Sequence, residues 1–310
     1  MTAADVAIVG SSPNALVAAV RLARAGKQVV VVEPDARVGG PVMTEEFAPG
    51  FHGNTDPILV FLVLLTIDLV ERRRPAWLAG IALGVAAEIK VLPVLLAPAM
   101  LLSLPGTRRR IEFCVGAAAA FLSGSAPFLF AVPELVITRV FGYTGQSGPW
   151  GLSLLALVVR ERARLSWMGE LYVRYGTMLS LYAVAGATLW LRPLSRRNVL
   201  FMPVGFVLFL FVAVIPGFGV QYLVWLVPWV VQLGSAPTAA YFLVGTVFLV
   251  GYYSSAAGTF PWYVANSLER PAWSGTVLGL GLICWTVVCV ITLVYARQLA
   301  AIKAEPSRTG

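Results

Sequence analysis

Polar, cationic and aromatic residues stand at the ends of several long apolar runs in this chain. Asn54 and Asp56 open one run, and Lys90 occupies a short turn between two others. Arginine and lysine suit a phosphate group, whereas amides together with aromatic faces suit a sugar. The set predicts a cleft that accepts both groups, and its binding candidates are Asn54, Lys90, Arg139, Tyr143, Arg160, Arg162, Arg164, Gln221 and Tyr222.

Simpler interpretations of these residues remain open. Asp56 suits the start of a helix as a capping carboxylate, and the alternative is a contact with a sugar or a metal. Lys90 could extend along apolar surface toward the membrane interface, and the arginines at 160, 162 and 164 could bind lipid headgroups. No metal site is predicted, because His52 is the only histidine and no cluster of metal ligands surrounds it.

The composition of the 310-residue chain is that of a membrane protein. Apolar residues make up 58% and charged residues 12%, and the mean hydropathy is +0.81; in soluble proteins about a quarter of the residues are charged. The 23 Lys and Arg exceed the 15 Asp and Glu, but they fall in short clusters between apolar runs, as is usual in membrane proteins. We therefore expect membrane lipids as partners and no nucleic acid.

Nine apolar runs are candidates for membrane helices, since a span needs about 20 apolar residues and fewer where neighbouring helices support it. They cover residues 54–71, 76–88, 91–104, 111–131, 171–191, 198–215, 220–234, 238–254 and 274–295. The fold class expected for this part is an all-α polytopic membrane protein with about nine transmembrane helices. The second and third runs meet at residues 88–90 and form either a hairpin or one broken element.

Two arginine triplets, at residues 72–74 and 108–110, orient the chain. Cationic loops concentrate on the cytoplasmic side of a membrane, and both triplets lie there only if the chain crosses twice between them, which favours the hairpin. The same alternation of sides places the basic tail at 297–310 in the cytoplasm. It places the candidate cleft on the outer face of a multi-pass protein of the plasma membrane.

The first fifty residues follow a different pattern. Residues 5–9 and 28–32 are short apolar strands, and the helical periodicity of residues 13–25 completes a βαβ unit. In a dinucleotide site one glycine makes the tight turn, a second admits the pyrophosphate and an acid binds the ribose; here Ser12 replaces the second glycine. The corresponding residues are Gly10, Ser12, Ala15, Glu33, Gly39 and Gly40.

This segment resembles the N-terminus of phytoene desaturase-like FAD oxidoreductases over about residues 4–52. The resemblance implies FAD at those six residues if the segment is functional, but the later strands, the substrate domain and the second flavin contact are missing. We therefore expect an incomplete Rossmann-like βαβ fragment without a bound cofactor. The expected domains are this fragment at 1–52, a multi-span membrane domain at 53–296 and the polar tail at 297–310.

Four motifs follow one another in the membrane part. They are Gly-Asn-Thr-Asp-Pro at 53–57, Leu-Ala-Gly-x-x-Leu-Gly-x-Ala-Ala-x-x-Lys-x-x-Pro at 78–93, Gly-Pro-Trp-Gly at 148–151 and Gln-Tyr-Leu-x-Trp-x-x-Pro at 221–228. Over about residues 53–295 the chain resembles the polyprenyl-phosphate-sugar glycosyltransferases of the GT-C fold, including bacterial mannosyltransferase-like proteins. The resemblance implies sugar transfer outside the cytoplasm, from a polyprenyl-phosphate donor to a lipid or glycan acceptor, with outer-loop cations on the phosphate.

The resemblance also places a catalytic carboxylate in a first outer loop, which should precede residue 53, where the flavoprotein-like fragment stands. We therefore expect a truncated transferase in which Asp56 is the nearest surviving candidate for the catalytic base. Two other functions stay open. A non-enzymatic binder or transporter of lipid-linked substrates would be expected to show internal repeats, and a membrane-anchored FAD-dependent oxidoreductase would need a complete flavin domain.

Overall fold

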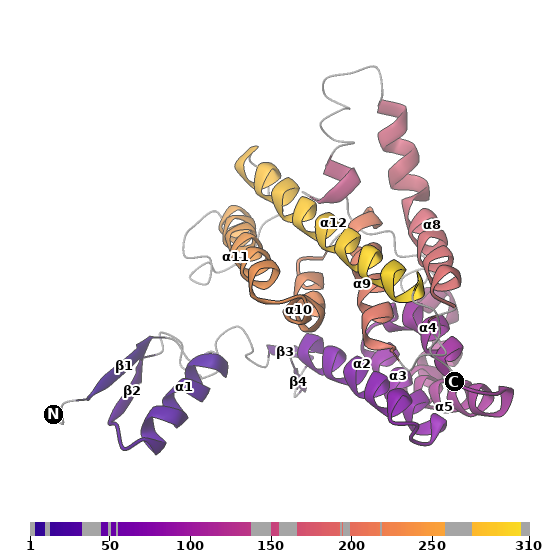
Figure 1. Cartoon of the computed structure of the whole chain (residues 1–310), viewed down its shortest axis with the longest axis horizontal. Helices are drawn as coiled ribbons and strands as arrows, with labels where there is room; N and C mark the ends of the chain where they lie inside the picture. Colours follow the sequence, from indigo (N-terminus) through magenta and orange to yellow (C-terminus); the bar gives the residue numbers. More distant parts are fainter. Residues whose placement is uncertain are drawn as a thin grey trace. The chain divides into compact units, whose positions relative to one another are not determined.

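The computed structural model of the chain describes residues 4–9, 13–32, 45–48, 51–53, 55–137, 150–154, 166–192, 194, 199–217, 219–257 and 275–304 (Figure 1). Two compact units make up the chain, Met1–Ile58 and Leu59–Gly310. Strands are described in the first unit, whereas the elements described in the second are helices.

The first unit contains the predicted βαβ arrangement. Its elements are β1 (Val6–Val9), α1 (Pro13–Arg24), β2 (Val29–Val32), β3 (Glu45–Ala48) and β4 (Phe51–Gly53). β1 and β2 pair in parallel, and α1 connects them. α1 stops where Gly26 takes a φ of +81°, a left-handed conformation that glycine adopts without steric cost. The antiparallel pair of β3 and β4 was not predicted from the sequence.

The helices of the membrane part occur where the apolar runs predict them. In chain order they are α2 (Thr55–Glu71), α3 (Ala76–Ile89), the 3-10 helix η2 (Leu92–Leu96), α4 (Ala97–Ser103), α5 (Thr107–Ala131), α6 (Pro133–Val136), α8 (Ser166–Leu191), α9 (Phe201–Val214), α10 (Tyr222–Gln232), α11 (Ser235–Ala257) and α12 (Gly275–Ala304). The run at 91–104 is divided between η2 and α4. Within the described residues, three helices are long and apolar enough to cross a membrane on their own: α5, α11 and α12.

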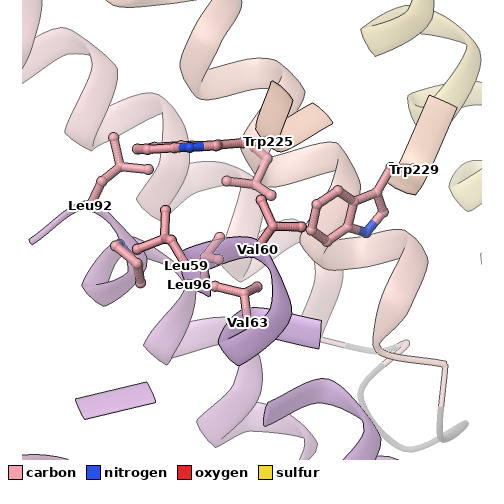
Figure 2. A pocket seen from close by; sticks show the side chains of 9 residues that line it. Leu59, Val60, Val63, Leu92, Leu96, Trp225 and Trp229 are labelled. Atoms are coloured by element: carbon pink, nitrogen blue, oxygen red, sulfur yellow. The ribbon is translucent and has the colours of Figure 1, made fainter. Parts of the chain in front are cut away.

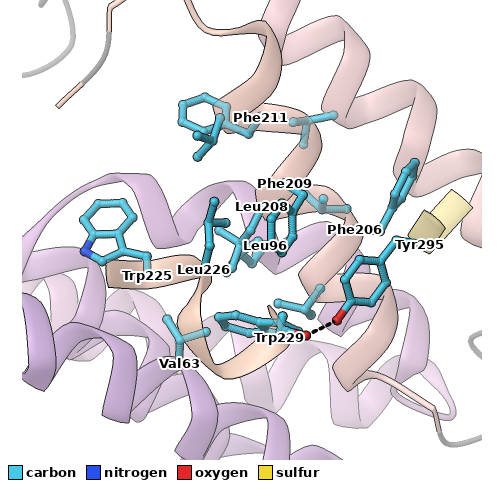
Figure 3. Packing of buried hydrophobic residues seen from close by; sticks show 14 of the residues in the cluster. Val63, Leu96, Phe206, Leu208, Phe209, Phe211, Trp225, Leu226, Trp229 and Tyr295 are labelled. Carbon is cyan, nitrogen blue, oxygen red and sulfur yellow. Dashed lines mark hydrogen bonds between the residues drawn. The ribbon is translucent and has the colours of Figure 1, made fainter. Parts of the chain in front are cut away.

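Helix α9 lies at the centre of the second unit. It packs against η2, α8, α10 and α12, and most of its residues are buried. A helix that is hydrophobic all round needs cover on every face, and these neighbours provide it. Figure 3 shows part of this core, where Phe209 stacks on Tyr295 of α12 with ring centroids 5.7 Å apart. The Tyr295 hydroxyl donates a hydrogen bond to the Trp229 carbonyl at 2.6 Å, so the buried phenol is satisfied.

Helices α3 and α5 run parallel and in close contact. A Cβ atom at Gly80 would collide with the carbonyl oxygen of Phe113, and one at Gly116 would collide with the carbonyl of Trp77. Small residues let the backbones of membrane helices approach this closely. Later residues of α3 contact later residues of α5, which establishes the parallel direction.

The parallel direction of α3 and α5 distinguishes between a hairpin and one broken element at residues 76–104. Because α3 and α5 both start at the same end, η2 and α4 must return the chain between them. The two arginine triplets meet at that end, where the Arg109 Nη2 donates to the carbonyl of Arg74 at 2.5 Å. We call this end of the second unit, which carries the triplets at 72–74 and 108–110, the arginine end. The hairpin arrangement is therefore the one that the structure adopts.

The starts and ends of other helices also gather at the arginine end. The Glu71 carboxylate accepts the backbone N–H groups of Leu200 at 2.8 Å and Phe201 at 3.1 Å. It thus caps the N-terminus of α9, where a carboxylate is favourable. Ser103 of α4 and Leu191 of α8 line one small hollow together with the start of α9. Helices α2, α4 and α8 therefore end where α3, α5 and α9 begin.

Candidate functional site

Lys90 terminates helix α3 at the end opposite the arginine end. Its backbone is extended, and its N–H donates to the Ala86 carbonyl at 3.1 Å. Its Nζ lies 4.9 Å from the centroid of the Trp225 indole on α10. Such a cation–π contact contributes about 0.5–1 kcal/mol at exposed sites and more where water is excluded. The contact brings together two of the motifs that resemble the GT-C transferases.

An apolar groove adjoins this contact, and the indole of Trp225 forms one of its walls (Figure 2). The lining residues are Leu59, Val60 and Val63 of α2, Leu92, Pro93 and Leu96 of η2, Leu208 of α9, and Trp225 and Trp229 of α10. The indole N–H of Trp229 donates to the Phe201 carbonyl at 2.8 Å, so it is already satisfied. The groove is narrow, with a free volume of about 10 Å³, roughly that of one water molecule. Its apolar lining offers nothing to replace the hydrogen bonds of a polar group.

The C-terminal end of α9 leads into the turn that carries Gln221 and Tyr222. Five side chains from other parts of the chain donate hydrogen bonds to the backbone carbonyls of residues 212–216. The pairs are Trp150 Nε1 to Val212 (2.9 Å), Trp285 Nε1 to Ala213 (2.8 Å), Tyr172 Oη to Val214 (2.6 Å), Ser180 Oγ to Val214 (3.0 Å) and Ser153 Oγ to Pro216 (2.5 Å). The last carbonyls of a helix have no partner within the helix, and an unpaired carbonyl is costly in an apolar medium. The five bonds therefore fix the position of this turn.

Three of the predicted site residues, Lys90, Gln221 and Tyr222, lie near the groove or near the turn that precedes α10. Tyr222 begins α10 and packs on Trp225 with ring centroids 4.8 Å apart, so the Lys90 ammonium, Trp225 and Tyr222 form one cluster. Gln221 immediately precedes Tyr222, and its side chain lies against Gly219, where an added Cβ would come within 2.7 Å of the Gln221 Oε1.

Asp56 lies in the first turn of α2 and is half-buried. An acidic side chain at this position is favourable because the N-terminus of a helix carries partial positive charge. The position is thus compatible with both interpretations of Asp56, as a helix-start carboxylate and as a functional group. Among the described residues, no group of three or more His, Cys, Asp or Glu is placed to hold a metal ion.

The remaining predicted residues lie outside the described part of the chain, with the exception of Ala15, which is in α1. They are Gly10, Ser12, Glu33, Gly39, Gly40, Asn54, Arg139, Tyr143, Arg160, Arg162 and Arg164. Their roles stay predictions.

Glu88, two residues before Lys90, was not among the predicted site residues. Its Oε1 accepts the Ser125 N–H at 3.0 Å and the Ser125 hydroxyl at 2.5 Å. It reaches α5 because Gly124 leaves room, since a Cβ there would lie 2.7 Å from the Glu88 Oε2. An ionisable residue within a membrane helix usually has a functional or structural partner, and this rule applied to residue 88 would have identified it. Glu88 anchors the end of α3 that carries Lys90.

The fold and the groove define the chain as a polytopic helical membrane protein. Within it, residues 50–144 match the family model described as mannosyltransferase (PIG-M), and residues 8–61 match the model of an NAD(P)-binding Rossmann-like domain. The two matches overlap at residues 50–61. Both predicted resemblances are thereby confirmed: a glycosyltransferase-like membrane segment follows a fragment that resembles a nucleotide-binding domain. No curated protein and no solved structure matches the chain.

Proposed function

We propose that the membrane domain binds a polyprenyl-phosphate-linked sugar and transfers the sugar, a mannose or another hexose, to a lipid or glycan acceptor. The observation that carries this proposal is the Lys90 ammonium on Trp225, at one side of a groove lined by apolar residues. The apolar lining suits a prenyl chain, and because the free volume is only about 10 Å³, the chain would enter by separating α2 and η2 from α10. The ammonium suits the phosphate. We place the reaction on the extracytoplasmic face of the plasma membrane, with the C-terminus in the cytoplasm.

The transfer needs a base and a cation. In the proposed step the acceptor oxygen forms a bond to the anomeric carbon of the sugar, and the bond from that carbon to the phosphate oxygen breaks. The acceptor proton goes to a carboxylate, for which Asp56 is the candidate. The electron pair of the broken bond leaves with the phosphate, whose charge Lys90 and the arginines at 160, 162 and 164 stabilise.

The test is transfer from a polyprenyl-phosphate sugar to an acceptor lipid in proteoliposomes. Asp56→Asn keeps the shape of the side chain but removes the base, so we expect at least about a hundredfold loss of turnover with donor binding retained. Lys90→Gln should weaken donor binding about tenfold, and less at high salt, where charge is screened. Lys27→Gln is the matched control, because Lys27 is an exposed lysine in the first unit. Full activity of Asp56→Asn would remove this residue from the mechanism.

We further propose that residues 1–52 occupy the place of the first span and acidic outer loop found in GT-C transferases. Replacing them with such a span and loop should then restore or raise turnover. If the protein with the replaced segment binds the donor as the wild type does but transfers no sugar, the alternative of a non-enzymatic binder of lipid-linked substrates is supported. Equal transfer before and after the replacement would show that the missing loop is not required.

A further inference from the structure

A second apolar groove lies on the other side of α9, near the arginine end. It is a shallow groove, open along one side, with a volume of about 330 Å³. It is lined by Ala183, Gly186, Ala187 and Trp190 of α8, Phe206 and Leu210 of α9, and Ala296 of α12. It shares no lining residue with the groove beside Lys90.

Small side chains leave this groove open. A Cβ atom added at Gly186 would meet no atom within 4 Å, whereas one added at Gly80 in the α3–α5 contact would collide with the opposite backbone. Gly186 is therefore not needed for close helix packing. Its absent side chain contributes space, and in a membrane such an apolar space is filled by hydrocarbon.

A cation stands where the groove ends. The Lys303 Nζ lies 5.3 Å from the centroid of the Trp190 ring and donates to the Trp190 carbonyl at 3.3 Å. Ala296 lies two helical turns before Lys303 on the same face of α12, so the groove leads along α12 toward the ammonium. An ammonium has three donors, and the bond to the Trp190 carbonyl uses one of them.

We propose that this groove binds one acyl chain of an anionic phospholipid, whose phosphate is held by Lys303. The apolar lining accepts the chain, and the remaining donors of the ammonium face the headgroup. Arg192, which directly follows α8, adds positive charge at the same end. The inference concerns a lipid of the surrounding membrane and is independent of the proposed sugar transfer.

The experiment measures the thermal unfolding midpoint of the full chain in detergent with added phosphatidylglycerol or with phosphatidylcholine of the same acyl chains. We expect phosphatidylglycerol to raise the midpoint of the wild type more than phosphatidylcholine does. Lys303→Gln should remove that difference and weaken phosphatidylglycerol binding about fivefold, the effect of one cation near an anionic headgroup. Gly186→Leu should remove the stabilisation by both lipids, because leucine fills the groove.

Gly279→Leu on α12 is the matched control, since a Cβ there also meets nothing within 4 Å and Gly279 does not line the groove; it should respond as the wild type does. Inorganic phosphate in place of lipid should have no effect. The proposal is overturned if the preference for phosphatidylglycerol is equal in the wild type and both test variants, or if free phosphate reproduces it. It is also overturned if only the Gly186 variant changes, because Lys303 then holds no headgroup. Lys303 is exposed, so the Lys303→Gln variant is expected to fold. It therefore still tests the proposal if the Gly186→Leu variant does not fold.

Discussion

Glu88 shows how one carboxylate can connect two membrane helices. It accepts two hydrogen bonds from Ser125, and it lies two residues before Lys90. Buried polar groups in membranes are favourable only when they are paired. We infer that Glu88 is a positioning residue, which holds the end of α3 so that Lys90 reaches Trp225.

Glu88→Ala should lower the free energy of unfolding by about 1 kcal/mol, because the Ser125 hydroxyl loses its acceptor. Glu88→Gln keeps an acceptor oxygen and should lose less. The measurement is reversible unfolding in mixed micelles. Glu112→Ala is the control, since Glu112 forms only a surface pair with Arg108 at 3.0 Å and should change stability by less than about 0.5 kcal/mol. An equal effect of the two alanine variants would refute the role of Glu88.

Among the helices, the α3–α5 pair depends most on shape. Gly80 and Gly84 face the backbone of α5, and a Cβ atom at either position would collide with a carbonyl oxygen, of Phe113 or of Ala117. This contact, rather than the hydropathy of either helix, holds the two arginine triplets at one end.

Gly80→Leu should therefore separate α3 from α5 and destabilise the protein by about 1–3 kcal/mol or more, as overpacking does. Unfolding in mixed micelles again provides the measurement. Gly245→Leu on α11 introduces the same side chain where nothing lies within 4 Å, and its stability should stay close to that of the wild type. If Gly80→Leu is as stable as Gly245→Leu, the helices do not need the close approach.

For the molecule as a whole, the alternating directions of the helices predict which ends face the same side of the membrane. With Cys114, Cys284 and Cys289 replaced, a cysteine at Ser255 should react with an impermeant thiol reagent added from outside. A cysteine at Arg73 should react only after the membrane is permeabilised. The reverse pattern would place the arginine end outside, against the usual distribution of positive charge, and would move the Lys90 cluster to the cytoplasm.

The first unit predicts a second property of the whole chain, the absence of a flavin. Among the described residues of the first unit, the parallel sheet has two strands, β1 and β2, and at the sequence position where the pyrophosphate would approach, Ser12 adds a side chain. The purified protein should therefore show none of the visible absorbance bands of a flavin. A yellow preparation with one FAD per chain would instead favour the oxidoreductase alternative.

The sequence by itself determined where the helices of this protein lie. Hydropathy reports the free energy of transferring each residue from water to lipid. This is a local property of the sequence, so the apolar runs correspond to α2–α5 and α8–α12. The valine-rich strands and the periodicity of α1 predicted the βαβ unit for the same reason. Arginine placement also predicted the hairpin, because charge is excluded from the membrane core.

Only the tertiary structure decided which faces of these helices meet. The contact of Lys90 with Trp225, the anchoring of Glu88 on Ser125 and the groove that ends at Lys303 each join residues far apart in the chain. Such contacts depend on the shapes of opposing surfaces, including the absence of a side chain at Gly80, Gly124 or Gly186. Lipid is as apolar as a leucine side chain, so within a membrane hydropathy favours no one partner over another, and close packing makes the choice.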